Sequence, residues 1–238
     1  MPPNPLIFAL DISAKEVTSW VRLLKGRVWG FKVGKILFTQ RGPQVIREIR
    51  GEGGEVFLDL KYHDIPNTVS GAVASATRLG VSMLSLHALG GREMILRAVE
   101  AAKETSAKEG ITSPKVLAVT LLTSLTQRDL EDWGVKGGIQ ELVVRLASLA
   151  KASGVDGVIS SPQEIGAIRE RCGADFLIVT PGVRPEGASL HDQSRIATPY
   201  EAMRAGADFL VIGRPIREAS DPLGMVDAIL DEVRRAIP

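Results

Sequence analysis

Residues 57–69 read FLDLKYHDIPNTV, an apolar strand pattern that runs into a polar loop. Asp59 and Lys61 stand two positions apart, and because successive side chains of a strand point to opposite faces, both project to the same side. With Asp64, three charges fall within six residues where the strand meets the loop. Charged groups at the end of an apolar strand are costly to bury unless they are paired or used. We therefore expect a functional site at this strand end.

Short apolar runs like the one that contains Asp59 recur along the whole chain. Most of them are continuous rather than alternating, as expected for parallel strands that are covered on both faces. We predict eight strands, over residues 7–11, 30–33, 56–61, 83–87, 115–122, 157–160, 176–180 and 209–213.

Segments with helical spacing of apolar residues lie between these runs. The predicted helices cover residues 15–25, 44–50, 69–79, 92–108, 139–152, 162–171, 198–205 and 225–236. Eight strand–helix units in a chain of 238 residues indicate an α/β fold of the (β/α)8 TIM barrel type. A doubly wound open sheet is the alternative, because a sequence alone does not show closure. No linker divides the chain, so we expect a single domain over residues 1–238.

The composition narrows the class of protein. Hydrophobic residues make up 45% and charged residues 24%, which is ordinary for a globular enzyme with a large core. A formal net charge of +1 argues against a nucleic-acid binder and against a polybasic membrane anchor. Cys172 is the single cysteine, which fits a reducing cytosol, so we expect a cytoplasmic protein. The apolar run from Leu6 to Leu10 is too short for a signal peptide or a membrane span.

Polar residues mark several of the predicted strand ends, where the reacting groups of this fold lie. Lys32 lies on the second strand, and we place it with Asp59 and Lys61 in the functional site. Asp11 ends the first strand; the capping-box spacing of Ser13 and Glu16 would serve the next helix and leave Asp11 for a ligand. His87, at the end of the fourth strand, suits a hydrogen-bonded packing residue about as well as a ligand.

The loops after the last two strands suggest anion binding. Gly213-Arg214-Pro215 ends the eighth strand and opens a helix, where backbone amides and the Arg214 guanidinium would hold a phosphate dianion. The alternative is a tight turn beside a surface charge. The constrained loop Pro181-Gly182-Val183-Arg184-Pro185 continues through Gln193 and could cover the ligand as a lid, or be a plain surface loop.

Taken together, these pieces resemble the orotidine 5'-phosphate decarboxylase family, in its stand-alone prokaryotic form. The resemblance covers nearly the whole chain, and its motifs are Ala9-Leu10-Asp11, Phe31-Lys32-Val33-Gly34, Asp59-Leu60-Lys61, Asp64-Ile65-Pro66-Asn67-Thr68, Leu122-Thr123-Ser124, Pro181-Gly182-Val183-Arg184, Asp192-Gln193 with Arg195, and Gly213-Arg214. The Asp-x-Lys-x-x-Asp pattern alone is shared with other barrels of the same suprafamily. Its combination with Lys32 and the Pro-Gly-Val-Arg-Pro loop is specific.

The resemblance implies an activity and an array of catalytic residues. The activity is the decarboxylation of orotidine 5'-phosphate to uridine 5'-phosphate, the last step of de novo UMP synthesis, with no metal or other cofactor. The catalytic array would be Lys32, Asp59, Lys61 and Asp64, which together carry no net charge. Lys61 would stabilise a carbanion at C6 of the pyrimidine and then protonate it. Asp64, with Ile65 and Thr68, would belong to the site of a neighbouring subunit, which implies a homodimer.

The resemblance also assigns the substrate-binding residues. Asp11 and Lys32 would bind the ribose hydroxyls, joined by Thr68 of the partner. The residues implied for the rest of the nucleotide are Thr123 and Ser124 at the pyrimidine, Gln193 between base and phosphate, Gly213 and Arg214 at the phosphate, and Arg184 at the phosphate or in loop closure. The residues that would give carbon dioxide an apolar pocket, or be ordinary packing, are Leu122, Ile65, Pro181 and Val183.

Two other functions stay open at this point. Metal-dependent sugar-phosphate aldolases or lyases of the same suprafamily place a magnesium-binding Glu on the second strand, where this chain has Lys32. A catalytically silent barrel that binds phosphorylated nucleosides would keep Gly213 and Arg214 but would not need Lys61 beside Asp59.

Overall fold

The chain forms a closed barrel of eight parallel strands. The computed structural model describes residues 4–186 and 197–237, and the strands follow one another around the barrel in chain order. They are β1 (Leu6–Ala9), β2 (Gly30–Gly34), β3 (Val56–Tyr62), β4 (Met83–His87), β5 (Lys115–Val119), β6 (Gly157–Ile159), β7 (Leu177–Thr180) and β8 (Phe209–Ile212). β1 pairs with β8 through Leu6 and Leu210, which closes the sheet. Closure confirms the predicted (β/α)8 fold and overturns the open-sheet alternative.

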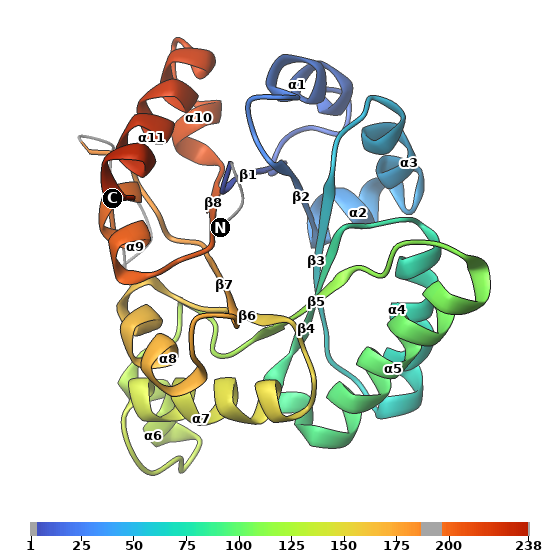
Figure 1. The fold of residues 1–238 in the computed structure, drawn as a ribbon, viewed down its shortest axis with the longest axis vertical. Coiled ribbons are helices and arrows are strands. Elements are labelled where there is room, and N and C mark those ends of the chain that lie inside the picture. The colour runs from blue at the N-terminus through green and yellow to red at the C-terminus, as the bar shows by residue number, and fades with distance from the viewer. Residues whose placement is uncertain (1–3, 187–196, 238) are drawn as a thin grey trace.

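Helices surround the barrel (Figure 1). They are α1 (Val17–Leu24), α2 (Lys35–Arg41), α3 (Gln44–Gly51), α4 (Pro66–Arg78), α5 (Gly91–Glu109), α6 (Gln127–Asp132), α7 (Ile139–Ala152), α8 (Ile165–Cys172), α9 (Pro199–Ala205), α10 (Arg214–Arg217) and α11 (Pro222–Ala236), with 3-10 turns η1 (Ala88–Gly90) and η2 (Pro162–Glu164). Within the described ranges, no helix is both long enough and apolar enough to cross a membrane.

Several helices begin at a proline, whose fixed φ and missing N–H suit the first helical position. Pro66, Pro199 and Pro222 open α4, α9 and α11 in this way. Asp221 adds a side-chain cap, because its Oδ1 accepts a hydrogen bond from the Gly224 amide (3.0 Å). Such starts fix where each helix leaves the loop above its strand.

The start of α1 differs from the prediction. The helix begins at Val17, and its cap residue, Glu16, makes no side-chain capping bond. The Ser13 amide instead donates to Glu16 Oε2 (3.2 Å), and Ser13 Oγ accepts from the Lys15 amide (3.4 Å). The capping role predicted for Ser13 is therefore wrong, because these bonds close a turn before the helix.

Two apolar layers make up the core. One lies between the sheet and the helices, and the other fills the inside of the barrel. The side chains that fill the inside are Ile7, Ala9, Phe57, Met83, Leu117, Val119, Ile159, Val179, Phe209 and Val211. Since both faces of each strand are covered, the strands read as continuous apolar runs.

At the amino ends of the last strands, a partly buried ion pair links the loops. Arg169 Nη2 donates to Asp208 Oδ2 (2.6 Å), and the same carboxylate oxygen accepts the Ile178 amide (2.7 Å). Arg169 also donates to the carbonyl oxygens of Phe176 (2.7 Å) and Gly206 (2.6 Å). The Arg169–Asp208 ion pair therefore links α8, β7 and β8 at the amino ends of the strands.

Candidate active site

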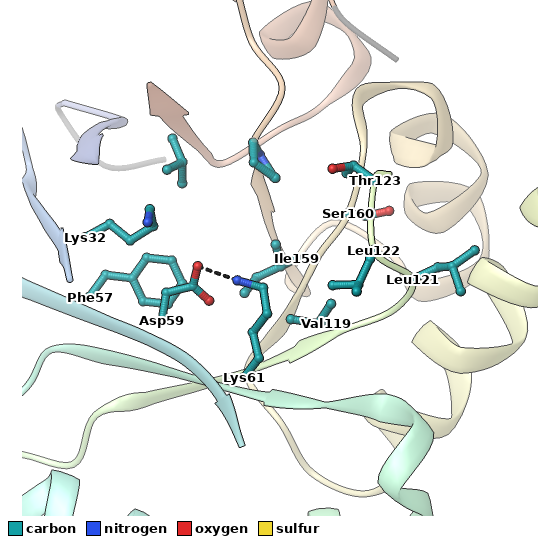
Figure 2. A pocket seen from close by; sticks show the side chains of 12 residues that line it. Lys32, Phe57, Asp59, Lys61, Val119, Leu121, Leu122, Thr123, Ile159 and Ser160 are labelled. Carbon is teal, nitrogen blue, oxygen red and sulfur yellow. Dashed lines mark hydrogen bonds and ion pairs between the residues drawn. The ribbon is translucent and has the colours of Figure 1, made fainter. Parts of the chain in front are cut away.

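A cavity of about 210 Å³ opens at the carboxyl ends of the strands, where barrels of this kind carry their active sites. Its lining residues are Lys32, Phe57, Asp59, Lys61, Val119, Leu121, Leu122, Thr123, Ile159, Ser160, Pro181 and Val211. Figure 2 shows the charged side chains on one side and Leu121, Leu122, Thr123 and Ser160 on the other. Phe57, Val119, Ile159 and Val211 also belong to the core inside the barrel, so the cavity stands on an apolar floor.

Asp59 and Lys61 form an ion pair at the edge of this cavity. Lys61 Nζ lies 2.6 Å from Asp59 Oδ2, and the two side chains are 26% and 10% exposed. Ser85 Oγ donates a second hydrogen bond to Asp59, at Oδ1 (2.8 Å). Burial opposes ionisation of Asp59, but the positive charges of Lys61 and Lys32 and the two hydrogen bonds outweigh it and hold the pKa of Asp59 below its ordinary value. Asp59 is therefore a carboxylate at neutral pH.

The backbone at Lys61 departs from a regular strand. Lys61 has φ +52°, and among the described residues it is the one non-glycine residue with a positive φ. Leu58 pairs with Leu84 and Tyr62 with Leu86, so β3 advances four residues where β4 advances two. The two side chains do meet as predicted. The bulge and the left-handed backbone, rather than strict alternation alone, set where Lys61 points.

Lys32 reaches the cavity from β2 and pairs with Asp11. Lys32 Nζ lies 3.3 Å from Asp11 Oδ1, with the lysine side chain 13% exposed and the aspartate side chain 58% exposed. Asp11 lies beyond the end of β1, two residues after Ala9. A Cβ on Gly34 would lie 3.2 Å from Lys32 Nζ and 3.6 Å from Asp11 Oδ1, so a glycine leaves room for this pair.

Asp64 and its neighbours lie outside the cavity of their own chain. Asp64 and Thr68 are exposed and line a second pocket together with His63, and Lys61 lines both this pocket and the cavity. Ile65 is 67% exposed as a residue, and its amide donates to Asp64 Oδ1 (2.7 Å). One chain therefore brings together three members of the predicted array, without Asp64, and Ile65 does not line the cavity.

The residues after β5 and β7 divide between the cavity and its surroundings. Leu122, Thr123 and Pro181 line the cavity, whereas Ser124 is exposed and outside it. Val183 is fully buried in the core rather than at the cavity. Arg184 is buried too, and its Nη1 donates to the Val183 carbonyl oxygen (2.9 Å).

Gly213 and Arg214 follow β8, as the sequence predicts, and Arg214 is the first residue of α10. A Cβ on Gly213 would lie 3.0 Å from Ala9 Cβ, so the end of β8 passes close to β1. Gly213 is buried and Arg214 is partly buried. The predicted residue Gln193 lies outside the described residues.

His87 packs as a neutral hydrogen-bonded side chain. Its ring stacks on that of His63, with centroids 5.2 Å apart, and its Nδ1 accepts from the Leu89 amide (3.4 Å). Burial first, and then the neighbouring His63, Lys61 and Lys35, lower the pKa of His87 from 6.5 to about 4. The sequence left open whether His87 is a ligand or a hydrogen-bonded packing residue, and its contacts are those of a packing residue.

Sequence reasoning missed some residues that the structure places at the site. Ser85 holds Asp59 from β4, and Ser160, at the end of β6, lines the cavity. A polar residue in the middle of the apolar run 83–87 was the available signal for Ser85. In the described ranges, no three His, Cys, Asp or Glu side chains are grouped so that they could hold a metal ion.

Comparisons with known proteins show the family of this chain. The family model described as "Orotidine 5'-phosphate decarboxylase / HUMPS family" matches residues 4–229. The chain belongs to this family. Two relatives named orotidine 5'-phosphate decarboxylase are similar over most of their length: one from Geobacter sulfurreducens is 57% identical over 96% of this chain and 95% of its own, and one from Syntrophotalea carbinolica is 54% identical over 98% and 96%.

Solved structures agree as well. The crystal structure of orotidine 5'-phosphate decarboxylase from Lactobacillus acidophilus superposes with a TM-score of 0.83 at 39% identity, over 97% of this chain and 99% of that one. An uncharacterized conserved protein from Geobacillus kaustophilus gives a TM-score of 0.84, also at 39% identity, over 96% and 100%. The family match over residues 4–229 thus covers all eight strands of the barrel.

Proposed function

We propose that this chain decarboxylates orotidine 5'-phosphate to uridine 5'-phosphate and carbon dioxide, as the last step of de novo UMP synthesis. The observation that carries the proposal is the Asp59–Lys61 ion pair, with Nζ and Oδ2 2.6 Å apart, at the edge of an apolar cavity. Membership of the family and the names of the two relatives, both orotidine 5'-phosphate decarboxylase, support this substrate.

Lys61 supplies the charge that the reaction needs. When the bond between C6 and the carboxylate breaks, its electron pair stays on C6, in the plane of the ring, with no π system to delocalise it. An ammonium group already fixed beside C6 stabilises that charge as it develops. Lys61 Nζ then gives C6 a proton and recovers one from solvent, so the reaction consumes one proton overall and needs no electron sink.

Asp59 acts on both Lys61 and the substrate. It holds the Lys61 amine, and as a carboxylate it would lie close to the carboxylate of the substrate. Two like charges at 4 Å repel by about 4 kcal/mol at an effective dielectric constant near 20, and the repulsion disappears as carbon dioxide leaves. This effect favours the transition state, but we weight carbanion stabilisation by Lys61 above it.

The apolar lining would accommodate the departing carbon dioxide. Val119, Leu122, Ile159 and Pro181 line the cavity with Lys61. Carbon dioxide is uncharged and weakly polar, so it is accommodated by such a wall more easily than the carboxylate from which it forms. An apolar wall that excludes water would also strengthen the field of the Lys61 ammonium.

The ribose and phosphate would extend beyond the cavity. At about 210 Å³ it is smaller than common ligand pockets, which span on the order of 300–1,000 Å³. We assign the ribose to Asp11 and Lys32 and the pyrimidine edge to Thr123 and Ser124. The groups that we assign to the phosphate and to the loop that would close over it are the Gly213 amide, Arg214, Arg184 and Gln193.

A second copy of the chain would complete the site. Asp64 and Thr68 are exposed and outside their own cavity, and Ile65, an apolar residue that is 67% exposed, lies beside them. An apolar side chain flanked by polar ones suits an interface. We therefore propose a cytoplasmic homodimer of single-domain chains, residues 1–238, in which Asp64, Ile65 and Thr68 reach the partner's cavity.

The loss of orotidylate absorbance on addition of purified protein tests the proposal. We expect turnover in buffer containing a metal chelator, at a rate that added magnesium does not change. Activity that a chelator abolishes and magnesium restores would instead favour a metal-dependent lyase. Tight binding of uridine 5'-phosphate by calorimetry, without turnover of orotidine 5'-phosphate, would favour a silent nucleotide-binding barrel.

A further inference from the structure

Ser85 is a polar residue within an otherwise apolar strand. It lies in the middle of β4, between Leu84 and Leu86, and it is fully buried. Its Oγ accepts a hydrogen bond from the Lys61 amide (2.8 Å) and donates one to Asp59 Oδ1 (2.8 Å). One hydroxyl therefore contacts both members of the ion pair at the cavity, and both its donor and an acceptor position are used.

The hydroxyl stands where the β-ladder is interrupted. Between the pairs Leu58–Leu84 and Tyr62–Leu86, three residues of β3 face Ser85 alone on β4. Lys61 is one of these three residues, so its amide bonds to Ser85 Oγ in place of a regular backbone bond between β3 and β4. Lys61 also has the left-handed φ of +52°, a backbone conformation that persists only where the surrounding structure supports it.

The contacts close a ring. From the Lys61 amide the ring passes to Ser85 Oγ (2.8 Å), then to the Asp59 carboxylate (2.8 Å), and returns through Lys61 Nζ (2.6 Å). Both ends of the ring belong to Lys61, so the hydroxyl fixes the lysine backbone and the carboxylate that holds the lysine amine. Linked bonds of this kind depend on one another for their geometry.

We propose that Ser85 is a positioning residue for the decarboxylation, an inference that rests on the proposed function. Its hydroxyl anchors the bulge at Lys61 and orients Asp59, so that the Lys61 amine stays fixed beside C6. Ser85 itself is not among the residues that line the cavity, so it would act on the substrate only through Asp59 and Lys61. Its loss would affect the step at C6 rather than the binding of ribose and phosphate, which we assign to other residues.

The test compares Ser85→Ala with Ser106→Ala. Ser106 on α5 is also buried, and its Oγ donates to the Ala102 carbonyl oxygen (2.7 Å) in the outer helical layer. We expect Ser85→Ala to lower kcat by roughly 10- to 100-fold, because a misplacement of about 1 Å can cost about 10²-fold, while KM changes by less than about threefold. Ser106→Ala should keep both constants.

A pH measurement separates positioning from a plain loss of stability. Without the Ser85 hydrogen bond, the pKa of Asp59 rises, so the acid limb of kcat/KM in Ser85→Ala should move to higher pH. Direct titration of the Asp59 carboxyl by carbon NMR should show the same direction. This titration needs no turnover, so it still tests the role of Ser85 if the wild-type protein fails to decarboxylate orotidine 5'-phosphate.

Two results would overturn the role of Ser85. One is a folded Ser85→Ala protein with kcat within twofold of the wild type and an unmoved acid limb. The other is a titration in which the pKa of Asp59 is the same in both proteins. If Ser85→Ala does not fold, Ser85→Cys takes its place, because a thiol is only a weak donor and acceptor, and the same directions are expected.

Discussion

Lys61 combines two features that are each uncommon for a lysine. Its backbone adopts a positive φ, and its amine lies in a partly buried ion pair. Residues held in sparsely populated backbone conformations cost on the order of 1–3 kcal/mol and cluster at functional sites. In this conformation the Lys61 side chain lines the cavity, and its amine contacts Asp59. Position as well as charge therefore distinguishes Lys61 from the surface lysines.

Replacing Lys61 by Ala removes the charge proposed to stabilise the carbanion. We expect kcat/KM for orotidine 5'-phosphate to fall by at least about 10³-fold, since removal of a single stabilising donor costs about 10²–10³-fold and the proton donor is lost as well. Circular dichroism should show that the fold is retained. Lys103→Ala, on the exposed face of α5, is the matched control and should leave the rate unchanged. A Lys61→Ala rate within tenfold of the wild type would refute the role of Lys61.

His87 makes the stability of the protein depend on pH. Its pKa is about 4 in the folded chain and 6.5 for an unperturbed histidine, so the unfolded chain takes up a proton at a pH at which the folded chain does not. This contribution is complete above pH 6.5 and is lost as the pH falls from 6.5 to about 4. At about 1.4 kcal/mol per pKa unit it amounts to at most about 3 to 4 kcal/mol. The depressed pKa of Asp59 acts lower, because its contribution is lost only as the pH falls below the ordinary 3.8.

Urea unfolding at fixed protein concentration measures the effect of His87. We expect the free energy of unfolding of the wild type to decline between pH 6.5 and 4 more steeply than that of His87→Gln. Equal slopes for the two proteins would show that His87 does not stay neutral in the fold.

At the scale of single elements, the carboxyl end of β2 has little free space. Gly34 is extended, with φ −91° and ψ 179°, so its backbone suits any residue, but a Cβ there would lie 3.2 Å from Lys32 Nζ. At Gly166, in the first turn of α8, an added Cβ would have no atom within 4 Å apart from its chain neighbours and the backbone of its own helix. The two glycines therefore serve as a matched pair.

Gly34→Ala should disturb ligand binding rather than folding. The added methyl displaces Lys32 Nζ from Asp11, so we expect KM for orotidine 5'-phosphate to rise by roughly 3- to 10-fold, as small misplacements of binding groups do. Thermal unfolding should hardly change. Gly166→Ala should keep KM and gain up to about 1 kcal/mol of stability, because alanine favours a helix over glycine. An unchanged KM in Gly34→Ala would argue against Lys32 and Asp11 as the ribose site.

Sequence patterns predicted the strands better than the short helices. All eight strands were expected, because each is an apolar run flanked by turn residues. Helices α2 and α6 were missed, since each buries a single side chain, Leu37 and Leu130 respectively, and leaves no periodic stripe. Polar strand ends led to Lys32, Asp59 and Lys61. The bulge opposite Ser85 was out of reach, because alternation along one strand carries no information on its register with the next.

At the scale of the whole molecule, the proposed dimer predicts complementation between two defective chains. Lys61→Ala and Asp64→Ala should each be inactive alone. If Asp64 serves the neighbouring subunit, a mixed dimer carries both defects in one site and neither in the other. Random association then restores roughly a quarter of wild-type activity.

The measurement is the decarboxylation rate after unfolding and refolding the two variants together, with each variant refolded alone as the control. Sedimentation should find dimers in all samples. A mixture no more active than the sum of its parts would place Asp64 in the site of its own chain or outside any site.

The position of the Arg169–Asp208 ion pair affects how the sequence of such a barrel can evolve. It secures the loops at one mouth, while the reacting groups occupy the other. Substitutions around it shift the balance between the folded and unfolded chain without entering the chemistry. Thermal stability can therefore change through substitutions at the amino ends of the strands, while the reacting groups at the carboxyl ends stay the same.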